Sequence, residues 1–119
     1  MTVERRSNPR ALVNWKAQVK RRCGAQYLAS VANVCVDGLE LILDRSLPQG
    51  EIFELDLVVR QPGVSSYIRL SGAVCHCHCL AANLGCTIGV QLQQPPLLYR
   101  HQVERLQELG SPVSVYALV

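Results

Sequence analysis

Hydrophobic and polar side chains alternate along most of the chain. In residues 13–20, VNWKAQVK, the alternation runs without a slip, and a period of two residues is typical of a half-buried β-strand. Turn residues such as Gly24, Gly38 and Gly50 separate further segments with the same period. The pattern predicts six strands, at residues 13–20, 26–34, 39–43, 53–60, 67–79 and 86–92.

The period changes after the two prolines at residues 95–96. Tyr99, Val103 and Leu106 recur at helical spacing among charged and amide side chains, which is typical of an amphipathic helix. Glycine and proline within residues 110–112 predict the end of that helix. The sequence therefore predicts one C-terminal helix, over about residues 96–109.

Six short strands and one helix predict an all-β fold, a six-stranded antiparallel β-barrel whose C-terminal helix covers one mouth. The 119 residues, 49% of them hydrophobic, are enough for one core. We expect Trp15 to face this core, because it shares a strand face with Val13 and Ala17. We expect the apolar tail, residues 113–119, to pack back as an extra strand, with contact to a second subunit as the alternative.

The chain contains no apolar run of the roughly 20 residues that a membrane helix needs, and its first residues do not resemble a secretory leader. We therefore expect no membrane insertion and a cytoplasmic location. In that location the six cysteines are expected to be reduced thiols, which behave as small hydrophobic side chains, rather than disulfides.

Positive charge is concentrated in the first 22 residues. They hold seven basic side chains and one acidic side chain, a local net charge of +6, whereas the rest of the chain carries −3. A short basic segment suits a compact anionic ligand better than DNA or RNA, which usually meets a broader basic face. A solvated basic surface without any ligand is the alternative.

Two short motifs connect this charge to a known family. Residues 6–10, RSNPR, form an R-x-x-x-R stretch ahead of the first predicted strand, and residues 33–38, NVCVDG, lie at the turn between the second and third strands. Together they resemble the PilZ domain family, whose members carry R-x-x-x-R on an N-terminal arm and [D/N]-x-S-x-x-G after the second strand of a six-stranded barrel. The resemblance covers almost the whole chain and divides it into an arm, residues 1–10, and a barrel, residues 11–119.

The resemblance implies a receptor for cyclic di-GMP, a bacterial second messenger with two phosphates and two guanines. Arginine suits this ligand because its guanidinium forks onto a phosphate or a guanine edge and also stacks on a base. Pro9 biases Asn8 toward an extended conformation, in which Arg6 and Arg10 point to the same side. We expect the arm to be mobile when empty and to become ordered over the ligand.

The resemblance also assigns roles to single residues. Asn33 is assigned to a guanine edge, and Gly38 to a turn where a side chain would obstruct the backbone or the ligand. Cys35 stands where the family has serine, and the weaker hydrogen bond of a thiol costs on the order of 1 kcal/mol, about fivefold to tenfold in affinity. Arg5, directly before the R-x-x-x-R stretch, resembles the version of the motif that binds a stacked pair of ligands.

Two further interpretations of the whole chain remain open. The first is a degenerate PilZ barrel that binds a partner protein and no nucleotide. The second is a metal-binding or redox-responsive barrel built on residues 75–79, CHCHC, with Cys86. We expect alternation to place the three cysteines of this run on one face, about 7 Å apart, and the two histidines on the other, which does not suit four convergent zinc ligands.

The sequence therefore predicts a non-enzymatic receptor. No catalytic site is expected, since no nucleophile and base are paired with an orienting group, and no cofactor and no metal are expected either. The expected partners are cyclic di-GMP and an unidentified effector protein, and the expected oligomeric state is a monomer or a weak homodimer. Ligand binding is expected to close the arm over the ligand and so change the surface that the effector meets.

Overall fold

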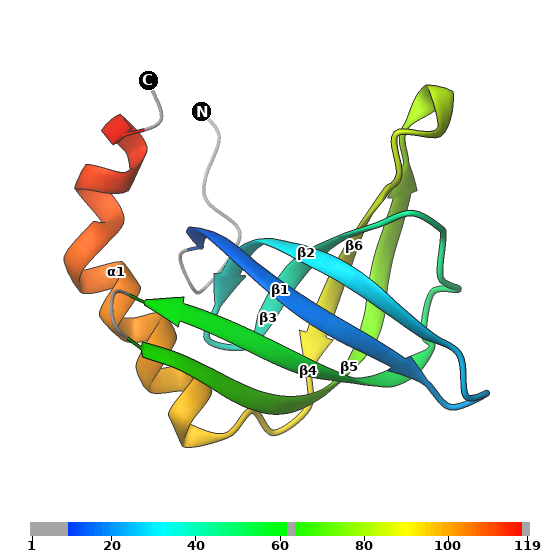
Figure 1. Ribbon diagram of the computed structural model, residues 1–119, viewed down its shortest axis with the longest axis horizontal. Coiled ribbons are helices and arrows are strands. Elements are labelled where there is room, and N and C mark those ends of the chain that lie inside the picture. Colours follow the sequence, from blue (N-terminus) through cyan, green and yellow to red (C-terminus); the bar gives the residue numbers. More distant parts are fainter. Residues whose placement is uncertain (1–9, 62–63, 118–119) are drawn as a thin grey trace, which may run out of the picture.

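The computed structural model describes residues 10–61 and 64–117. Its strands form a closed antiparallel barrel in the order β1-β2-β3-β6-β5-β4 (Figure 1). This architecture confirms the predicted six-stranded barrel with a C-terminal helix. The elements are β1 (Ala11–Arg21), β2 (Gln26–Cys35), β3 (Gly38–Leu43), β4 (Ile52–Gln61), β5 (Val64–Cys79), the short 3-10 turn η1 (Ala81–Asn83), β6 (Cys86–Leu92) and α1 (Leu97–Ala117).

The barrel interior is filled by the hydrophobic half of each alternating strand. Trp15, Ala17 and Val19 of β1 are buried, which confirms the predicted core position of Trp15. The apolar positions of β4, from Phe53 to Val59, are buried in the same way. Burial of these side chains is the main favourable term in folding a barrel of this size.

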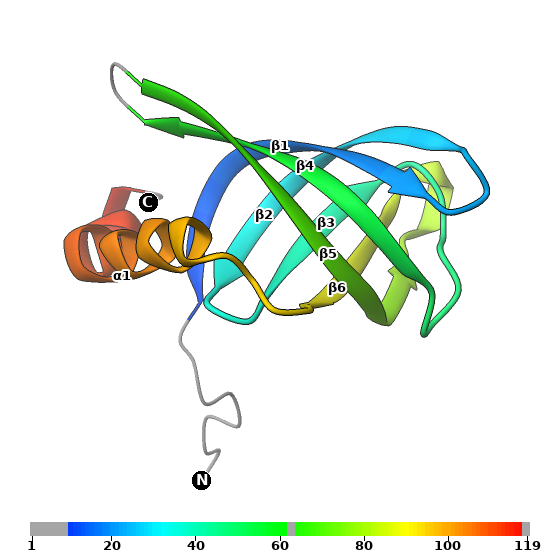
Figure 2. The ribbon, with the colours of Figure 1, turned by 90° about the horizontal axis from the view of Figure 1, so that it is seen from below.

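Helix α1 lies across one end of the barrel (Figures 1 and 2). Tyr99 and Val103 are fully buried in the core, and Leu106 packs against it. The helix ends at Ala117, so the predicted end near residue 109 is wrong, and so is the extra strand predicted for the tail. In the sequence, Val113 and Tyr116 continue the helical spacing of the apolar residues beyond Gly110, and glycine and proline do not end the helix although each locally disfavours it.

The helix does not resemble a membrane span. Within residues 10–61 and 64–117, no helix has both the length and the hydropathy to cross a bilayer.

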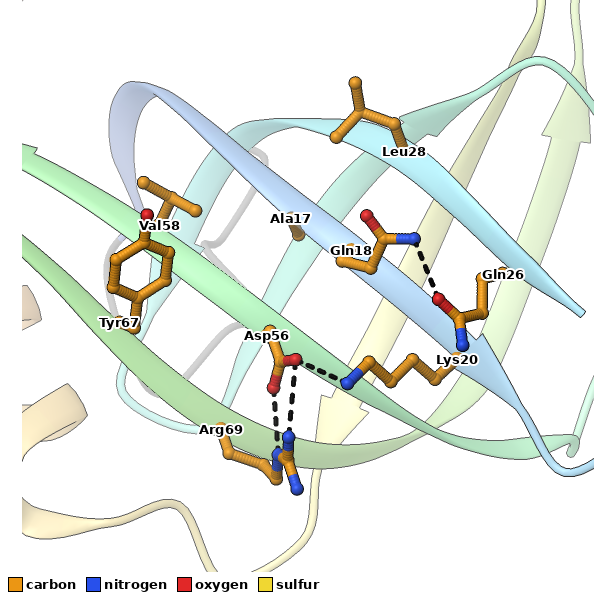
Figure 3. Close-up of a pocket in the computed structure, with 9 residues that line it drawn as sticks. All are labelled: Ala17, Gln18, Lys20, Gln26, Leu28, Asp56, Val58, Tyr67 and Arg69. Atoms are coloured by element: carbon orange, nitrogen blue, oxygen red, sulfur yellow. Dashed lines mark hydrogen bonds and ion pairs between the residues drawn. The ribbon is translucent and has the colours of Figure 1, made fainter. Parts of the chain in front are cut away.

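The outer face of the barrel carries an ion-pair network beside an open hollow of about 570 Å³ (Figure 3). Asp56 of β4 lies between two cations: Lys20 Nζ is 2.7 Å from its Oδ2, and Arg69 Nε is 2.9 Å from its Oδ1. Leu28 and Tyr67, exposed at 71% and 76%, line the same hollow. The network thus connects β1, β4 and β5 across the surface.

Replacing Asp56 with asparagine is expected to reduce the free energy of unfolding by about 0.5 kcal/mol at pH 7, the usual size of a solvent-exposed pair. The hydrogen bond from Arg69, followed by that from Lys20, lowers the pKa of Asp56. The contribution is therefore present above the ordinary pKa of aspartate and disappears as pH falls through the lower pKa of the folded protein.

Urea denaturation at pH 7 and at about pH 2.5 measures this effect, because the lower value lies well below the usual pKa of an aspartate. The difference between wild type and Asp56→Asn should shrink at the acidic pH. Glu104→Gln, on the exposed side of α1, serves as the control for removing one surface carboxylate. A difference that is equal at both pH values would contradict the assignment to the Asp56 network.

Candidate functional site

The turn between β2 and β3 is held from two other elements. Cys35 pairs with Gly38 across the turn, and the Leu92 backbone N–H donates to the Asp37 carbonyl at 2.9 Å. From α1, the Tyr99 hydroxyl lies 2.8 Å from the Cys35 carbonyl oxygen and 3.0 Å from the Gly38 carbonyl oxygen, and its one hydrogen is shared between these two acceptors. Burial strongly raises the pKa of Tyr99, as do the nearby Cys35 and Asp37, so its hydroxyl stays protonated and able to donate. The turn is therefore anchored by both β6 and α1.

Gly38 has a packing reason to be glycine. A Cβ at this position would lie 2.7 Å from the Val90 carbonyl oxygen, a distance too short for any side chain without a backbone shift. Gly38 pairs with Gln91 at the edge of β3 and β6, so its lack of a side chain lets the two strands approach closely at the base of the turn. The obstruction of the backbone anticipated from the sequence is thus present, whereas its role toward a ligand stays a prediction.

Asn33 owes its orientation to irregular pairing on both sides of β2. Between Val31 and Asn33 the strand has one extra residue relative to β3, and β1 has a register shift between Leu12 and Trp15. Val31 and Val34 are both buried although they lie three positions apart, an odd number, so the alternation slips by one residue at the bulge. Asn33 is half-buried as a result.

The amide of Asn33 is held by a residue that the sequence did not single out. Glu40, its cross-strand partner on β3, accepts a hydrogen bond from Asn33 Nδ2 at 2.9 Å. This contact could be predicted only from the pairing register of β2 and β3, because Glu40 lies seven residues away from Asn33 on the far side of the turn. Glu40 is therefore a positioning residue for the Asn33 side chain.

Cys35 presents a neutral thiol at the same turn. Burial raises the pKa of this thiol, and so does its hydrogen bond to Asp37. Cys35 Sγ donates to Asp37 Oδ1 at 3.0 Å, so Asp37 has a defined contact in addition to its place in the turn. The residue that departs from the PilZ pattern is thus already engaged by a carboxylate.

Arg10 is the one residue of the R-x-x-x-R stretch that the structure describes, since residues 6–9, with Arg6 among them, and the preceding Arg5 lie outside the described residues. It is exposed and directly precedes β1. Ala11 pairs with Val34, and Leu12 pairs with Asn33, so Arg10, one residue before the paired segment, lies beside the end of β2 that carries Cys35. The β1–β2 pairing therefore brings Arg10, Asn33, Cys35 and Gly38 together at the end of the barrel that meets α1.

The family profile described as PilZ domain matches residues 4–108. The chain belongs to the PilZ domain family. None of the curated proteins compared with this PilZ domain is a significant match.

Solved structures share the fold of this PilZ domain. Bacillus subtilis MotI/DgrA, an inhibitor of motility, has a TM-score of 0.78 at 11% identity, covering 93% of this chain and 54% of that one. The PilZ domain of Escherichia coli YcgR, solved with c-di-GMP, has a TM-score of 0.71 at 13% identity, covering 96% and 98%. The K. pneumonia MrkH–c-di-GMP complex has a TM-score of 0.72 at 16% identity, covering 98% and 57%. At these identities the likeness shows the fold, and the chain spans about half the length of MotI/DgrA and MrkH.

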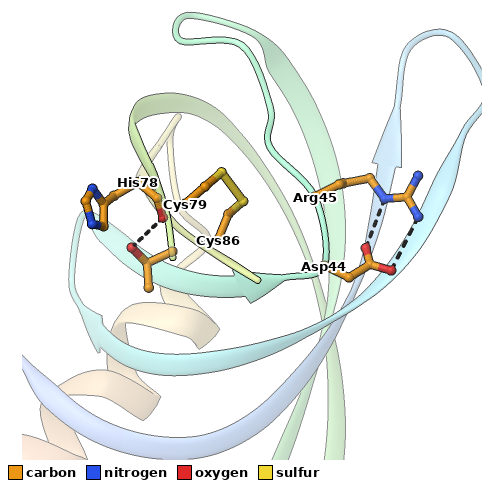
Figure 4. The surroundings of a disulfide bond; sticks show 6 residues. Asp44, Arg45, His78, Cys79 and Cys86 are labelled. Carbon is orange, nitrogen blue, oxygen red and sulfur yellow. Dashed lines mark hydrogen bonds and ion pairs between the residues drawn. A yellow bond between two sulfur atoms is a disulfide. The ribbon is translucent and has the colours of Figure 1, made fainter. Parts of the chain in front are cut away.

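A second cluster lies at the β5–β6 end of this PilZ domain. Cys79 and Cys86 are paired across the two strands and joined by a disulfide bond (Figure 4), so the expectation of six reduced thiols is wrong for these two. The reason is the strand register, which places the two residues directly opposite each other and cannot be deduced from their spacing of seven residues. The remaining described cysteines, Cys23, Cys35, Cys75 and Cys77, are free.

The alternation predicted for residues 75–79 also fails at one position. Val74 pairs with Val90 and His76 pairs with Gly89, so Cys75 is an extra residue in β5 and forms a bulge. Cys75 is exposed at this bulge, whereas Cys77 packs against the core. Cys77 and Cys79 therefore share a face without Cys75.

Proposed function

We propose that this PilZ domain is a non-enzymatic receptor for cyclic di-GMP. The observation that supports the proposal best is the β1–β2 register, in which the last arginine of R-x-x-x-R adjoins the N-x-C-x-x-G turn, although 22 residues separate the two motifs along the chain. Structural neighbours solved with c-di-GMP, the YcgR domain and MrkH, support the same ligand.

In the proposed complex the arginines supply charge and planar surfaces, and the turn supplies polar groups. Arg6 and Arg10 contact the phosphates or the guanine edges through charge-assisted hydrogen bonds, which are stronger than neutral ones. Asn33, oriented by Glu40, contacts a guanine edge. The anchored turn provides a rigid surface against which the arm closes, so that arm, ligand and barrel together form the surface that an effector protein recognises.

Calorimetric titration of the full chain with cyclic di-GMP tests the proposal, and the fluorescence of Trp15 offers a second readout. Saturable binding with a micromolar dissociation constant is expected, with GTP as the ligand control. Two ligands per chain, reduced to one in Arg5→Ala, would identify the stacked pair. A flat titration of folded protein would overturn the proposal and favour the degenerate protein-interaction barrel, which the replacement of the family's serine by Cys35 supports.

Replacing Cys35 with serine is expected to tighten cyclic di-GMP binding by about fivefold to tenfold, because a hydroxyl forms stronger hydrogen bonds than a thiol. The same calorimetric titration measures the change. Cys75→Ser is the matched control, because this exposed thiol lies on β5, away from the turn, and its affinity should equal that of wild type. An unchanged or weaker affinity in Cys35→Ser would show that the thiol does not contact the ligand.

A further inference from the structure

We propose that Cys77, Cys79 and Cys86 form a thiolate site for a thiophilic divalent cation such as zinc, open only when the Cys79–Cys86 disulfide is reduced. The sulfur atoms of these three residues all lie within 4.8 Å of one another. The site lies at the β5–β6 end of the barrel, away from the β2–β3 turn, and does not depend on the nucleotide proposal.

The strand pairing explains why three sulfurs converge here. Cys79 is directly opposite Cys86, and Cys77 is opposite the fully buried Ile88, one pair further into the barrel. Directly opposed residues of an antiparallel pair share a face, so the bulge at Cys75 turns Cys77 and Cys79 toward the side of Cys86. The three sulfurs therefore lie closer to one another than the backbone spacing of about 7 Å between alternate residues of one strand.

The dimensions of the cluster suit a bound ion. Zinc–sulfur bonds of about 2.3 Å in a tetrahedral site place neighbouring sulfurs about 3.8 Å apart. Cys77 Sγ already lies within 4.8 Å of the other two sulfurs, and the Cys79 and Cys86 sulfurs, which are bonded in the disulfide form, separate to that distance on reduction. Cys86 is 5% exposed and Cys77 is half-buried, whereas Cys79 is exposed. Two ligands are therefore held by packing, and the exposed side gives the ion an entry path and leaves room for water as a fourth ligand.

His78 is not the fourth ligand in this arrangement. It pairs with Thr87 on the opposite face of the strands, and Figure 4 shows its imidazole directed away from the disulfide. The predicted separation of the two histidine side chains from the cysteines is thus retained for His78. A site with three thiolates and one water follows.

The redox step balances with a dithiol reductant. Two electrons and two protons from the dithiol break the Cys79–Cys86 bond and give two thiols, while the reductant becomes a disulfide. Zinc binding then releases the protons of the three thiols, because thiolates are the ligands. In the oxidised protein only Cys77 of the three retains a free sulfur, so the site exists in one redox state.

The cysteine cluster and the candidate nucleotide site lie at opposite ends of the β3–β6 pair. Leu43 pairs with Cys86, and Gly38 pairs with Gln91, so the two pairs are five residue steps apart along each strand. At about 3.4 Å per residue the separation is roughly 17 Å. A variant at Cys77 or Cys79 should therefore leave nucleotide binding unchanged.

Titration of the reduced, metal-free full chain with zinc, against a chromophoric chelator, tests the site. One equivalent of zinc is expected, and cobalt should give thiolate-to-metal charge-transfer absorption. Zinc should protect Cys77, Cys79 and Cys86 from alkylation, as identified by mass spectrometry, and leave Cys23 and Cys75 reactive. Protein kept in the disulfide form should bind no zinc at the site.

Variants locate the ligands. Cys77→Ser and Cys79→Ser should each lose stoichiometric binding while circular dichroism shows a folded barrel, and Cys75→Ser should bind as wild type does. Cys86 is left unchanged because it is buried, and its alkylation protection reports its role without a substitution. Absence of binding to reduced, folded protein would overturn the proposal, as would full binding by Cys77→Ser or a requirement for Cys75.

Discussion

Replacing Arg10 with alanine is expected to weaken cyclic di-GMP binding by about a hundredfold. Truncating one partner of a charged, hydrogen-bonded pair at an interface costs about 2–5 kcal/mol, and about 2.7 kcal/mol corresponds to a hundredfold change in the dissociation constant. Arg10 is exposed and precedes β1, so the variant should fold as wild type does. Calorimetric titration of both proteins at one salt concentration measures the effect.

Arg22→Ala is the matched control for Arg10→Ala. Arg22 is also exposed and directly follows β1, so the two substitutions remove the same charge from opposite ends of one strand, roughly 35 Å apart. Arg22→Ala should bind as wild type does. Equal weakening by both variants would show that general attraction between a basic surface and an anion, rather than the R-x-x-x-R stretch, holds the ligand.

The variant Arg10→Lys distinguishes the contribution of the positive charge from that of the planar guanidinium shape. Lysine keeps the positive charge but cannot form the planar, two-pronged contact of a guanidinium. Arg10→Lys should therefore retain a small part of the affinity, closer to Arg10→Ala than to wild type. Wild-type affinity in this variant would mean that Arg10 acts only through its charge.

The strands could be predicted from the sequence because alternation is a local signal. A buried strand face repeats every two residues whatever its partner, and the bounds of β6, Cys86–Leu92, agree with the prediction to the residue. The end of α1 was predicted too early, because glycine and proline near residue 110 are local signals for a helix end, whereas the helix continues to Ala117.

The irregular positions of the barrel could not be predicted in the same way. A bulge is defined by two strands at once, and one extra residue turns every following side chain to the other face. The extra residue before Asn33 and the one at Cys75 decide how the Asn33 amide is held and which cysteines converge. Near the first bulge, the sequence indicates the slip only by two valines at positions 31 and 34, which are both buried although they lie an odd number of positions apart.

The long-range contacts between α1 and the β2–β3 turn could not be predicted from the sequence either. The sequence placed Tyr99 on the apolar face of the helix, which the structure confirms by its full burial. Its hydroxyl, however, reaches carbonyls 64 and 61 residues away. A helical period reports which face is buried and says nothing about which polar group a buried hydroxyl meets.

Replacing Tyr99 with alanine is expected to lower the free energy of unfolding by about 4 kcal/mol, within the usual range for truncating a fully buried aromatic side chain. Tyr99→Phe isolates the hydroxyl. It keeps the ring in the core but leaves the Cys35 and Gly38 carbonyls without this donor, at a cost of about 1–2 kcal/mol. Chemical denaturation of the three proteins measures both steps.

The Tyr99 hydroxyl should also affect nucleotide binding, because it connects α1 to the turn that the proposed ligand contacts. Tyr99→Phe is expected to weaken cyclic di-GMP binding severalfold under conditions where the variant is fully folded, since a less constrained turn loses more freedom on binding. Val103→Ala is the control: Val103 is equally buried on α1, and its truncation destabilises the helix packing without removing a hydrogen bond to the turn. If Tyr99→Phe and Val103→Ala lower stability but leave affinity equal to wild type, the anchor from α1 serves folding alone and the ligand does not depend on the turn that Tyr99 holds.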